Sequence, residues 1–287
     1  MSKTIYKKSR ISGKKWLINS ISVWDDIPRT SEEKALKHPA MFPVALVEKL
    51  IDCFVPLDAQ LLIDPFLGSG SALIGALNKK LSGIGFEVVP QFADISYRRL
   101  NKFSTNLWSS NVKVFLVKKP QRITINDNRT YYVINEDVRF ASSWVEDEIG
   151  DVLVTSPPYW VVHNRKRTAD GKNARPYSSR SDDIGNIENY DDFLIELQNI
   201  FTDMYRIMKG KSFSIVNVMD LRYGSNFLPF HIDMIKVMEF SGFTLEDIII
   251  WNRAKEYNKL RPLGYPYKFI VNKVHEYLLI FSKKQKV

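Results

Sequence analysis

The tetrapeptide Ser156-Pro157-Pro158-Tyr159 combines a hydroxyl group, an aromatic ring and two prolines directly after an apolar run, residues 151–155. The β-branched residues of that run predict a buried strand. Two successive prolines remove two amide donors and fix two φ angles, so the strand must end in a stiff, extended turn. Its unpaired oxygens could accept hydrogen bonds from an amino group, and its ring could stack on a flat molecule. The alternative is a plain strand terminator followed by surface aromatic residues.

A second motif lies upstream, where a strand, a glycine loop and a helix follow one another. Residues 61–64 are an apolar strand, residues 65–70 read Pro-Phe-Leu-Gly-Ser-Gly, and residues 71–81 have apolar side chains at helical spacing. This order predicts the first half of a nucleotide-binding βαβ unit. In such a unit the glycines let backbone amides approach the ligand, and the N-terminus of the helix favours negative charge.

The next strand, residues 83–87, ends in the acidic residue Glu87. A carboxylate at a strand end about 20 residues after a glycine loop is placed to hold ribose hydroxyls. Gly68 and Gly70 alone are a weak signal, but the loop, the spacing and the acid together predict a nucleotide site.

The remaining periodic segments predict one α/β domain. Further strands are expected at 130–134, 212–218, 243–251 and 275–281, and helices at 44–54, 90–103, 140–148, 190–208 and 230–241, with residues 209–211 ending the fourth of these helices. Seven strands with helices between most of them predict a Rossmann-like, doubly wound sheet. Ligands of such sheets bind beyond the carboxyl ends of the strands. Asp64, Glu87, Asp137 and the Pro-Pro turn all lie at or just after such ends.

Composition restricts the class of protein. The 287 residues are 45% hydrophobic and carry a formal net charge of +9, which favours a polyanionic partner, although a solvated basic surface would give the same balance. Cys53 is the single cysteine, which excludes an internal disulfide and a cysteine-based zinc site, and no metal site is expected. No apolar run spans a membrane and no signal core precedes the domain, so we expect a cytoplasmic protein.

Four polar or basic segments are candidates for contacting a large substrate. They are a basic N-terminal arm at 1–37, preceding a single catalytic domain at 38–287, and stretches near 104–130, 161–188 and 252–270 within that domain. The 161–188 segment leaves the Pro-Pro-Tyr turn directly and is too long for a plain connector. For the N-terminal arm the alternative is a partly ordered tail packed by Trp16 and Trp24, and for 161–188 it is a disordered surface loop.

The motifs Asp64-Pro-Phe-Leu-Gly-Ser-Gly70 and Thr155-Ser-Pro-Pro-Tyr159 resemble the DPFxGSG and (D/N/S)PP(Y/F/W) motifs of the S-adenosylmethionine-dependent DNA amino-methyltransferases of the N4-cytosine and N6-adenine type. The resemblance covers roughly residues 23–282 and implies a class I methyltransferase sheet, mostly parallel with strand seven antiparallel. It implies S-adenosylmethionine as cofactor. The positions that match cofactor-binding residues of the family are His38, Pro39, Phe42, Pro43, Asp64, Pro65, Phe66, Gly68, Ser69, Gly70, Glu87, Asp137 and Ser156.

The same resemblance implies that Ser156, Pro157, Pro158 and Tyr159 are catalytic. We expect the Ser156 hydroxyl and the Pro157 carbonyl to orient an exocyclic base amine, and Tyr159 to stack on a base flipped out of duplex DNA. Substrate contacts are expected from Trp160, Arg165, Lys166 and Arg167. Serine at the first motif position is associated mainly with N4 of cytosine in this family, and Asp or Asn mainly with N6 of adenine.

The expected function is therefore site-specific methylation of double-stranded DNA, in a restriction-modification or related role, by a monomer or homodimer with or without a separate cognate endonuclease. No large separate target-recognition domain is evident. The alternatives are an N6-adenine DNA methyltransferase, an RNA or tRNA guanine-N2 methyltransferase, and a catalytically silent cofactor-binding subunit. A protein-glutamine methyltransferase would carry Asn at position 156. A dehydrogenase would carry G-x-G-x-x-G, which the loop at 65–70 lacks.

Overall fold

A computed structural model describes residues 9–36, 41–106, 112–119, 121–123, 129–164, 178, 180, 183–257 and 260–285. Five predicted site residues lie outside the described residues: His38, Pro39, Arg165, Lys166 and Arg167. No helix in the described part of the chain is long and apolar enough to cross a membrane.

A nine-stranded sheet forms the centre of the protein, in the order β1-β10-β11-β7-β6-β2-β3-β5-β4. Only β11 runs antiparallel to its neighbours, which confirms the predicted doubly wound sheet with an antiparallel last strand. The strands are β1 (Val23–Trp24), β2 (Leu61–Asp64), β3 (Ser82–Phe86), β4 (Lys113–Val117), β5 (Thr130–Ile134), β6 (Gly150–Thr155), β7 (Met208–Val218), β10 (Thr244–Asn252) and β11 (His275–Ser282). A separate hairpin comprises β8 (Leu221–Tyr223) and β9 (Asn226–Leu228).

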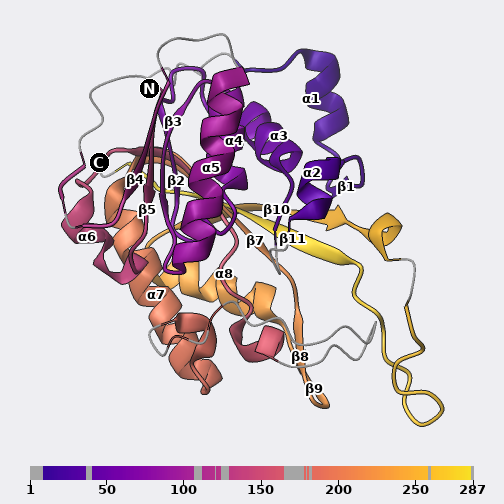
Figure 1. Ribbon diagram of the computed structural model, residues 1–287. Helices are drawn as coiled ribbons and strands as arrows, with labels where there is room; N and C mark the ends of the chain where they lie inside the picture. Colours follow the sequence, from indigo (N-terminus) through magenta and orange to yellow (C-terminus); the bar gives the residue numbers. More distant parts are fainter. Residues whose placement is uncertain are drawn as a thin grey trace.

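Helices cover both faces of the sheet, as Figure 1 shows, so the central strands can be apolar on both sides. Along β2, Leu61 and Ile63 pack into one core and Leu62 into the other. The helices are α1 (Gly13–Asn19), α2 (Ser31–Ala35), α3 (Val44–Phe54), α4 (Ser71–Asn78), α5 (Pro90–Asn106), α6 (Ala141–Trp144), α7 (Tyr190–Ile207) and α8 (Phe230–Phe240), with short 3-10 turns η1 (Val138–Phe140), η2 (Trp160–Asn164), η3 (Ile184–Asn186) and η4 (Ala254–Glu256). Helices α3 and α4 bury side chains in the core that contains Leu62, and α7 and α8 bury theirs in the other.

The sheet is wider than the seven predicted strands. β1 adds a strand beside β10, and β4 adds one beside β5. β4 comes from the stretch at 104–130, so this part of that stretch extends the sheet. Whether any of the stretch contacts a substrate stays a prediction.

Several predicted helix boundaries are wrong. The helix expected at 71–81 ends at Asn78, and the helix expected at 90–103 continues to Asn106. The helix expected at 140–148 shrinks to the four residues of α6. The tripeptide 209–211 does not separate α7 from the next strand, because β7 begins at Met208, directly after α7. Met208 is fully buried and pairs with Gly150 of β6, and the register between these strands shifts before Val152 pairs with Phe213. Core packing therefore extends the strand through a sequence that has the composition of a turn.

Candidate active site

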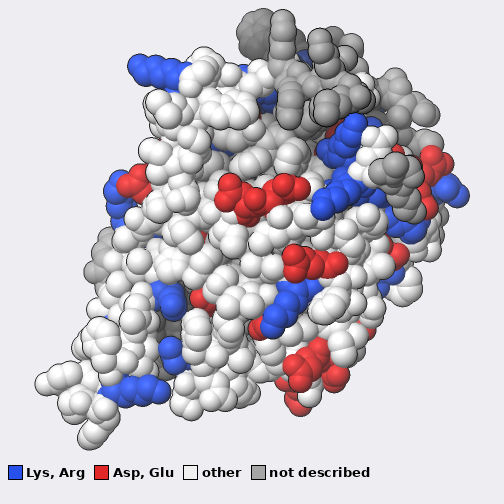
Figure 2. Space-filling view, turned by 180° about the vertical axis from the view of Figure 1, so that it is seen from behind, with Lys and Arg blue, Asp and Glu red and all other residues white. Residues whose placement is uncertain are grey.

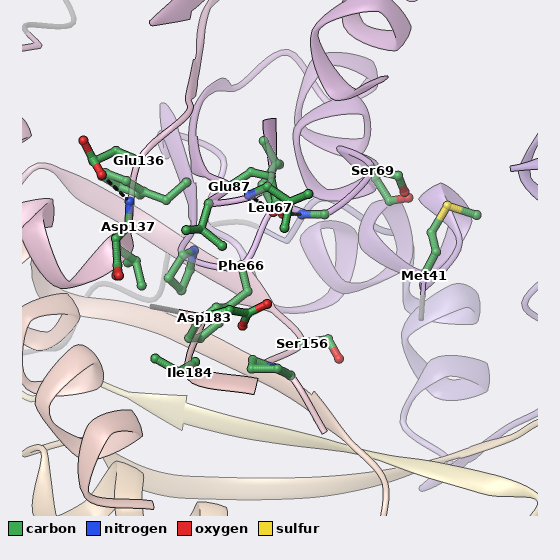
Figure 3. A pocket seen from close by; sticks show the side chains of 18 of the residues that line it. Met41, Phe66, Leu67, Ser69, Glu87, Glu136, Asp137, Ser156, Asp183 and Ile184 are labelled. Atoms are coloured by element: carbon green, nitrogen blue, oxygen red, sulfur yellow. Dashed lines mark hydrogen bonds between the residues drawn. The ribbon is translucent and has the colours of Figure 1, made fainter. Parts of the chain in front are cut away.

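The parallel topology brings the carboxyl ends of β2, β3, β5 and β6 to one edge of the sheet, where a cavity of about 800 Å³ of empty space, part of it open to solvent, lies beside them. Figure 3 shows Glu136 and Asp137 at one end of this cavity, Ser69 and Met41 at the other, and Ser156 on its lower side. The lining residues are Met41, Phe42, Pro65, Phe66, Leu67, Gly68, Ser69, Ser71, Phe86, Glu87, Val88, Val89, Glu136, Asp137, Val138, Ser156, Pro158, Asp183 and Ile184.

Nine of the predicted site residues line this cavity together: Phe42, Pro65, Phe66, Gly68, Ser69, Glu87, Asp137, Ser156 and Pro158. Six predicted residues that the structure describes are not among the lining: Pro43, Asp64, Gly70, Pro157, Tyr159 and Trp160. The glycine loop (residues 65–70) and the Pro-Pro turn (residues 156–159), 86 positions apart in the chain between Gly70 and Ser156, thus meet at one cavity.

The glycine loop is held in place by α5. Gly68 and Gly70 have φ angles of 55° and 86°, in the left-handed region that only glycine adopts freely. The Ser96 hydroxyl donates to the Gly68 carbonyl at 2.7 Å, and the buried Arg99 guanidinium donates to the Ser69 carbonyl at 2.5 Å. These two contacts fix the loop that forms one wall of the cavity.

Glu87 joins the loop to its own strand. One oxygen of its carboxyl group accepts from the Gly68 amide at 2.8 Å, and the other accepts from the Val89 amide at 2.8 Å. Burial raises the pKa of Glu87 to about 8, and the nearby negative charges of Asp183 and Asp64 add to the rise. A cation bound in the cavity would favour the ionised carboxylate and lower the pKa of Glu87 again.

Asp64 links the two motifs although it does not line the cavity. Its Oδ1 accepts from the Thr155 hydroxyl at 2.6 Å and from the Phe66 amide at 3.0 Å, so the end of β2 is tied to the end of β6. The side chain is fully buried, and Oδ2 has no hydrogen-bond partner among the described residues. Burial raises the pKa of Asp64 to about 7.

The Pro-Pro turn is packed tightly against the core. The Ser156 hydroxyl lies 3.3 Å from the Tyr159 hydroxyl, and the Tyr159 side chain, 4% exposed, meets the Phe230 ring edge-to-face at 6.4 Å. In this structure the Tyr159 ring therefore packs inside the protein, and its hydroxyl faces Ser156.

Trp160 anchors the end of the turn. Its backbone has a φ of 49°, and its indole donates to the Ile187 carbonyl at 2.7 Å. The ring packs against Tyr190 and Tyr223, with centroids 5.2 and 4.8 Å away. The structure thus gives Trp160 a position in the core, outside the cavity lining.

Two acidic side chains at the site were not predicted. Asp183 lines the cavity and accepts from the Gly185 amide at 2.9 Å and the Ser178 hydroxyl at 2.6 Å. Glu136 lines it as well and accepts from the Asp137 amide at 2.9 Å. Asp183 falls within the polar stretch at 161–188, and its only sequence signal is an Asp two residues before a Gly, a common turn pattern.

The wall at residues 41–43 is positioned by α2 and the segment before it. Arg29 donates to the Met41 carbonyl at 2.5 Å, and the buried Glu33 accepts from the Val44 amide at 2.7 Å. Glu33 also closes a capping box with Thr30 at the start of α2. Phe42 was predicted at this wall, and Met41 is a further lining residue.

The ionisable side chains that line the cavity are all acidic. Four acidic residues line it (Glu87, Glu136, Asp137 and Asp183), and none of the lining residues that the structure describes is Lys or Arg. Asp137 is paired with the guanidinium of Arg139 at 2.6 Å. Such a lining suits a ligand with positive charge and several hydrogen-bond donors.

A family model described as DNA methylase, of the N6 and N4 type, matches residues 2–98 and 151–287. The chain belongs to this DNA methylase family. Membership confirms the resemblance drawn from the two motifs, and both motifs fall within the matched ranges.

Curated relatives include the type II methyltransferase M.ScaI of Streptomyces caespitosus, 36% identical over 28% of this chain and 26% of that protein. The type II methyltransferase M.BglI of Bacillus subtilis is 29% identical over 38% of this chain and 31% of that protein. The chain thus spans about a quarter to a third of the length of these relatives. A TehB-like SAM-dependent methyltransferase from Corynebacterium glutamicum superimposes with a TM-score of 0.44 at 13% identity, over 86% of this chain and 90% of that one.

Proposed function

We propose that this chain transfers a methyl group from S-adenosylmethionine to an exocyclic amino group of a DNA base, N4 of cytosine. One observation carries the proposal: Ser156 and Pro158 of the catalytic turn line the same cavity as the glycine loop, Glu87 and Asp137. A methyl donor and an acceptor amine must meet within bonding reach, and this cavity is where the two motifs meet. The family membership and the type II methyltransferases among the relatives support DNA as the acceptor.

The residues present fit S-adenosylmethionine. Three buried polar atoms at the strand and helix ends have no partner among the described residues: Asp64 Oδ2, Ser69 Oγ and Ser71 Oγ. Acidic side chains suit the positive sulfonium and amino groups, and the N-terminus of α4 suits the carboxylate. Phe42, Phe66 and Ile184 supply apolar walls. Glu87 would hold the ribose hydroxyls, and Asp137 would lie near the adenine.

S-Adenosylmethionine supplies an activated methyl group when bound. The exocyclic amine is a poor nucleophile because its lone pair is conjugated with the base ring. Ser156 Oγ and the Pro157 carbonyl would each accept a hydrogen bond from one N–H group of this amine. These two hydrogen bonds would turn its lone pair toward the methyl group. The Tyr159 hydroxyl, 3.3 Å from Ser156 Oγ, would orient the serine hydroxyl. The enzyme would then work by positioning and by placed charge, without a covalent intermediate. The new N–C bond would replace the S–C bond of the methyl donor, and one of the two amine protons would be released to solvent.

Duplex DNA is the proposed partner, and the target base must leave the stack to reach Ser156. Arg165, Lys166 and Arg167 follow the catalytic turn and are proposed to contact flanking phosphates. A restriction-modification or related DNA-modification role, with or without a separate cognate endonuclease, is part of the same proposal.

The choice of cytosine rests on serine at position 156 and is tested by expressing the chain in a bacterial host without DNA methylation of its own. The host DNA is digested to nucleosides and analysed by mass spectrometry. We expect 4-methylcytosine. Finding 6-methyladenine would contradict the assignment of cytosine but support methyl transfer to an exocyclic amino group. Finding no methylated base would contradict both.

Cofactor binding should depend on pH. Burial raises the pKa of Asp64 to about 7 and that of Glu87 to about 8, so in the free protein both carboxyls still hold protons near neutral pH. A bound cation favours the ionised forms, so binding releases protons. The affinity for S-adenosylmethionine is therefore expected to rise between about pH 6 and 8, below the range where the ligand's own α-amino group loses its charge, by at most about tenfold per pH unit for each proton released.

Titration calorimetry across this range, in two buffers of different protonation enthalpy, measures both the affinity and the protons released. An affinity that is flat over the range, with no proton release, would contradict the acidic surroundings assigned to the cofactor.

A further inference from the structure

The connection between β10 and β11 leaves the sheet at the edge that carries the catalytic turn. β10 ends at Asn252, which pairs with His275 at the start of β11. On the next strand Tyr277 pairs with Val218, the last residue of β7, and β7 is parallel to β6. Figure 1 shows residues 260–274 extending well beyond the sheet in yellow. This segment is called the arm from here on and is distinct from the N-terminal arm at 1–37. The arm and Ser156 therefore project from the same edge.

The arm has a defined internal structure. Gly264 has a φ of 76°, and its carbonyl accepts from the amides of Tyr267 and Lys268, both at 2.8 Å. A side chain at position 264 would overlap the Lys268 carbonyl oxygen, so only glycine fits this turn. Nearer the sheet, the side-chain amide of Asn272 donates to the Arg261 carbonyl at 2.9 Å. This hydrogen bond joins the outgoing and returning segments of the arm.

The arm presents aromatic rings to solvent. Tyr265 is 80% exposed, Tyr267 95% and Phe269 93%, and the next alternate residue, Val271, is 59% exposed. Ile270, between two of them, is turned inward and half-buried. A cluster of large apolar side chains that an ordered turn exposes to solvent indicates a contact surface.

The charge of the arm identifies the kind of partner. It contains the basic residues Arg261, Lys268 and Lys273 and no Asp or Glu. The lobe that projects at the lower left of Figure 2 shows basic but no acidic side chains on its visible face. At the base of the arm, Lys273 lies over the ring of Phe227 in the hairpin β8–β9 at 4.9 Å, and Arg222 approaches the same ring at 5.6 Å. Rings interleaved with cations suit stacked bases joined by phosphates.

We propose that the arm is a DNA-contacting element, in which the rings of Tyr267 and Phe269 stack on bases next to the flipped base and Arg261 and Lys268 meet the adjacent phosphates. The inference rests on the proposed function and adds the element that holds the duplex open. Its position at the catalytic edge, together with its lack of acidic residues, favours nucleic acid over a second copy of the chain.

The test is a Tyr267→Ala/Phe269→Ala double variant, titrated with a labelled duplex of roughly 30 base pairs, about three helical turns. Binding of the duplex is expected to weaken about tenfold or more, the factor that loss of base-stacking rings implies. Binding of S-adenosylmethionine stays unchanged, because the arm does not line the cavity. Loss of methyl transfer is expected to be larger on duplex DNA than on heat-denatured DNA, whose bases are already unstacked.

Phe240→Ala is the matched control. Phe240 is also a highly exposed ring, 75% accessible, but it ends α8 just before β10 begins, at the opposite edge of the sheet from Asn252. We expect it to bind the duplex like the wild type. The same loss in this control would show that any exposed ring matters and would overturn the proposal.

Duplex binding by the double variant equal to that of the wild type would overturn the role of the arm. A wild-type dimer that the double variant converts to a monomer in sedimentation, with unchanged DNA affinity per chain, would assign the rings to an interface between copies. Wild type that transfers no methyl group to DNA contradicts the proposed function instead, so the two failures are distinguished.

Discussion

Replacing Ser156 with alanine is expected to lower kcat for methyl transfer about 100-fold, the usual effect of removing one positioned hydrogen-bonding group from an active site. Ser156 lines the cavity, and its hydroxyl would accept a hydrogen bond from an N–H group of the target amine. This hydrogen bond matters most in the transition state, while the bond between nitrogen and methyl forms. Single-turnover kinetics with saturating DNA measures the effect, and the dissociation constant of S-adenosylmethionine should change less than about threefold. An alanine variant with unchanged turnover would remove Ser156 from the catalytic group.

Tyr159→Phe separates orientation from binding. It keeps the buried ring, which meets Phe230 at 6.4 Å, and removes only the hydroxyl that lies 3.3 Å from Ser156 Oγ. Because that hydroxyl would act through Ser156, the loss in kcat should be smaller than for Ser156→Ala, about tenfold, the size expected for one neutral hydrogen bond. The double variant should be no slower than Ser156→Ala alone, since the two hydroxyls act as one unit. Additive losses would contradict this coupling.

Replacing Glu87 with glutamine is expected to raise the dissociation constant of S-adenosylmethionine about 100-fold. Both carboxyl oxygens accept a backbone amide, one from Gly68 and one from Val89. Glutamine has one oxygen and one NH₂ group, so one of these amides would face a donor and the glycine loop would shift. A buried donor left without its acceptor costs about 1–3 kcal/mol, and the ribose contact is lost in addition. Calorimetric titration measures the change.

The control is Asp94→Asn, a charge change of the same kind on the exposed face of α5, where Asp94 pairs with Lys118 at 3.3 Å. Exposed pairs contribute about 0–1 kcal/mol, so neither cofactor affinity nor stability should change measurably. If Glu87→Gln bound the cofactor like the wild type, the assignment of Glu87 to the ribose would be wrong.

Much of the fold could be predicted because its signals are local. The apolar residues Leu61, Leu62 and Ile63 are followed by Asp64, and β2 spans these four residues. The helical spacing in 44–54 gives α3 with the predicted bounds. The carboxyl ends of parallel strands all lie at one edge of the sheet. Acidic or polar residues that follow these strands therefore meet at this edge, however the helices pack. Glu87, Asp137 and Ser156 were therefore predictable as neighbours.

The remainder depends on contacts between distant parts of the chain. β1 has two residues and exists because Trp24 pairs with Trp251 at the end of β10. Asp183 reaches the cavity through η3, where Gly185 lies against Pro158 of the catalytic turn. Trp160 follows the motif, but a sequence does not tell whether its ring turns to the ligand or to the core. In the structure the ring packs in the core, where its indole donates to the Ile187 carbonyl. Edge pairing and side-chain direction are set by tertiary context.

Methylation of a DNA base by this chain is tested by transfer of labelled methyl groups from S-adenosylmethionine. The purified protein is offered unmethylated bacterial DNA, tRNA and protein extract in parallel. We expect label in DNA, retained on the bases after digestion and lost in Ser156→Ala. Label in tRNA or in protein and none in DNA would contradict it. So would tight cofactor binding with no transfer to any acceptor, which would assign the chain to a silent cofactor-binding subunit.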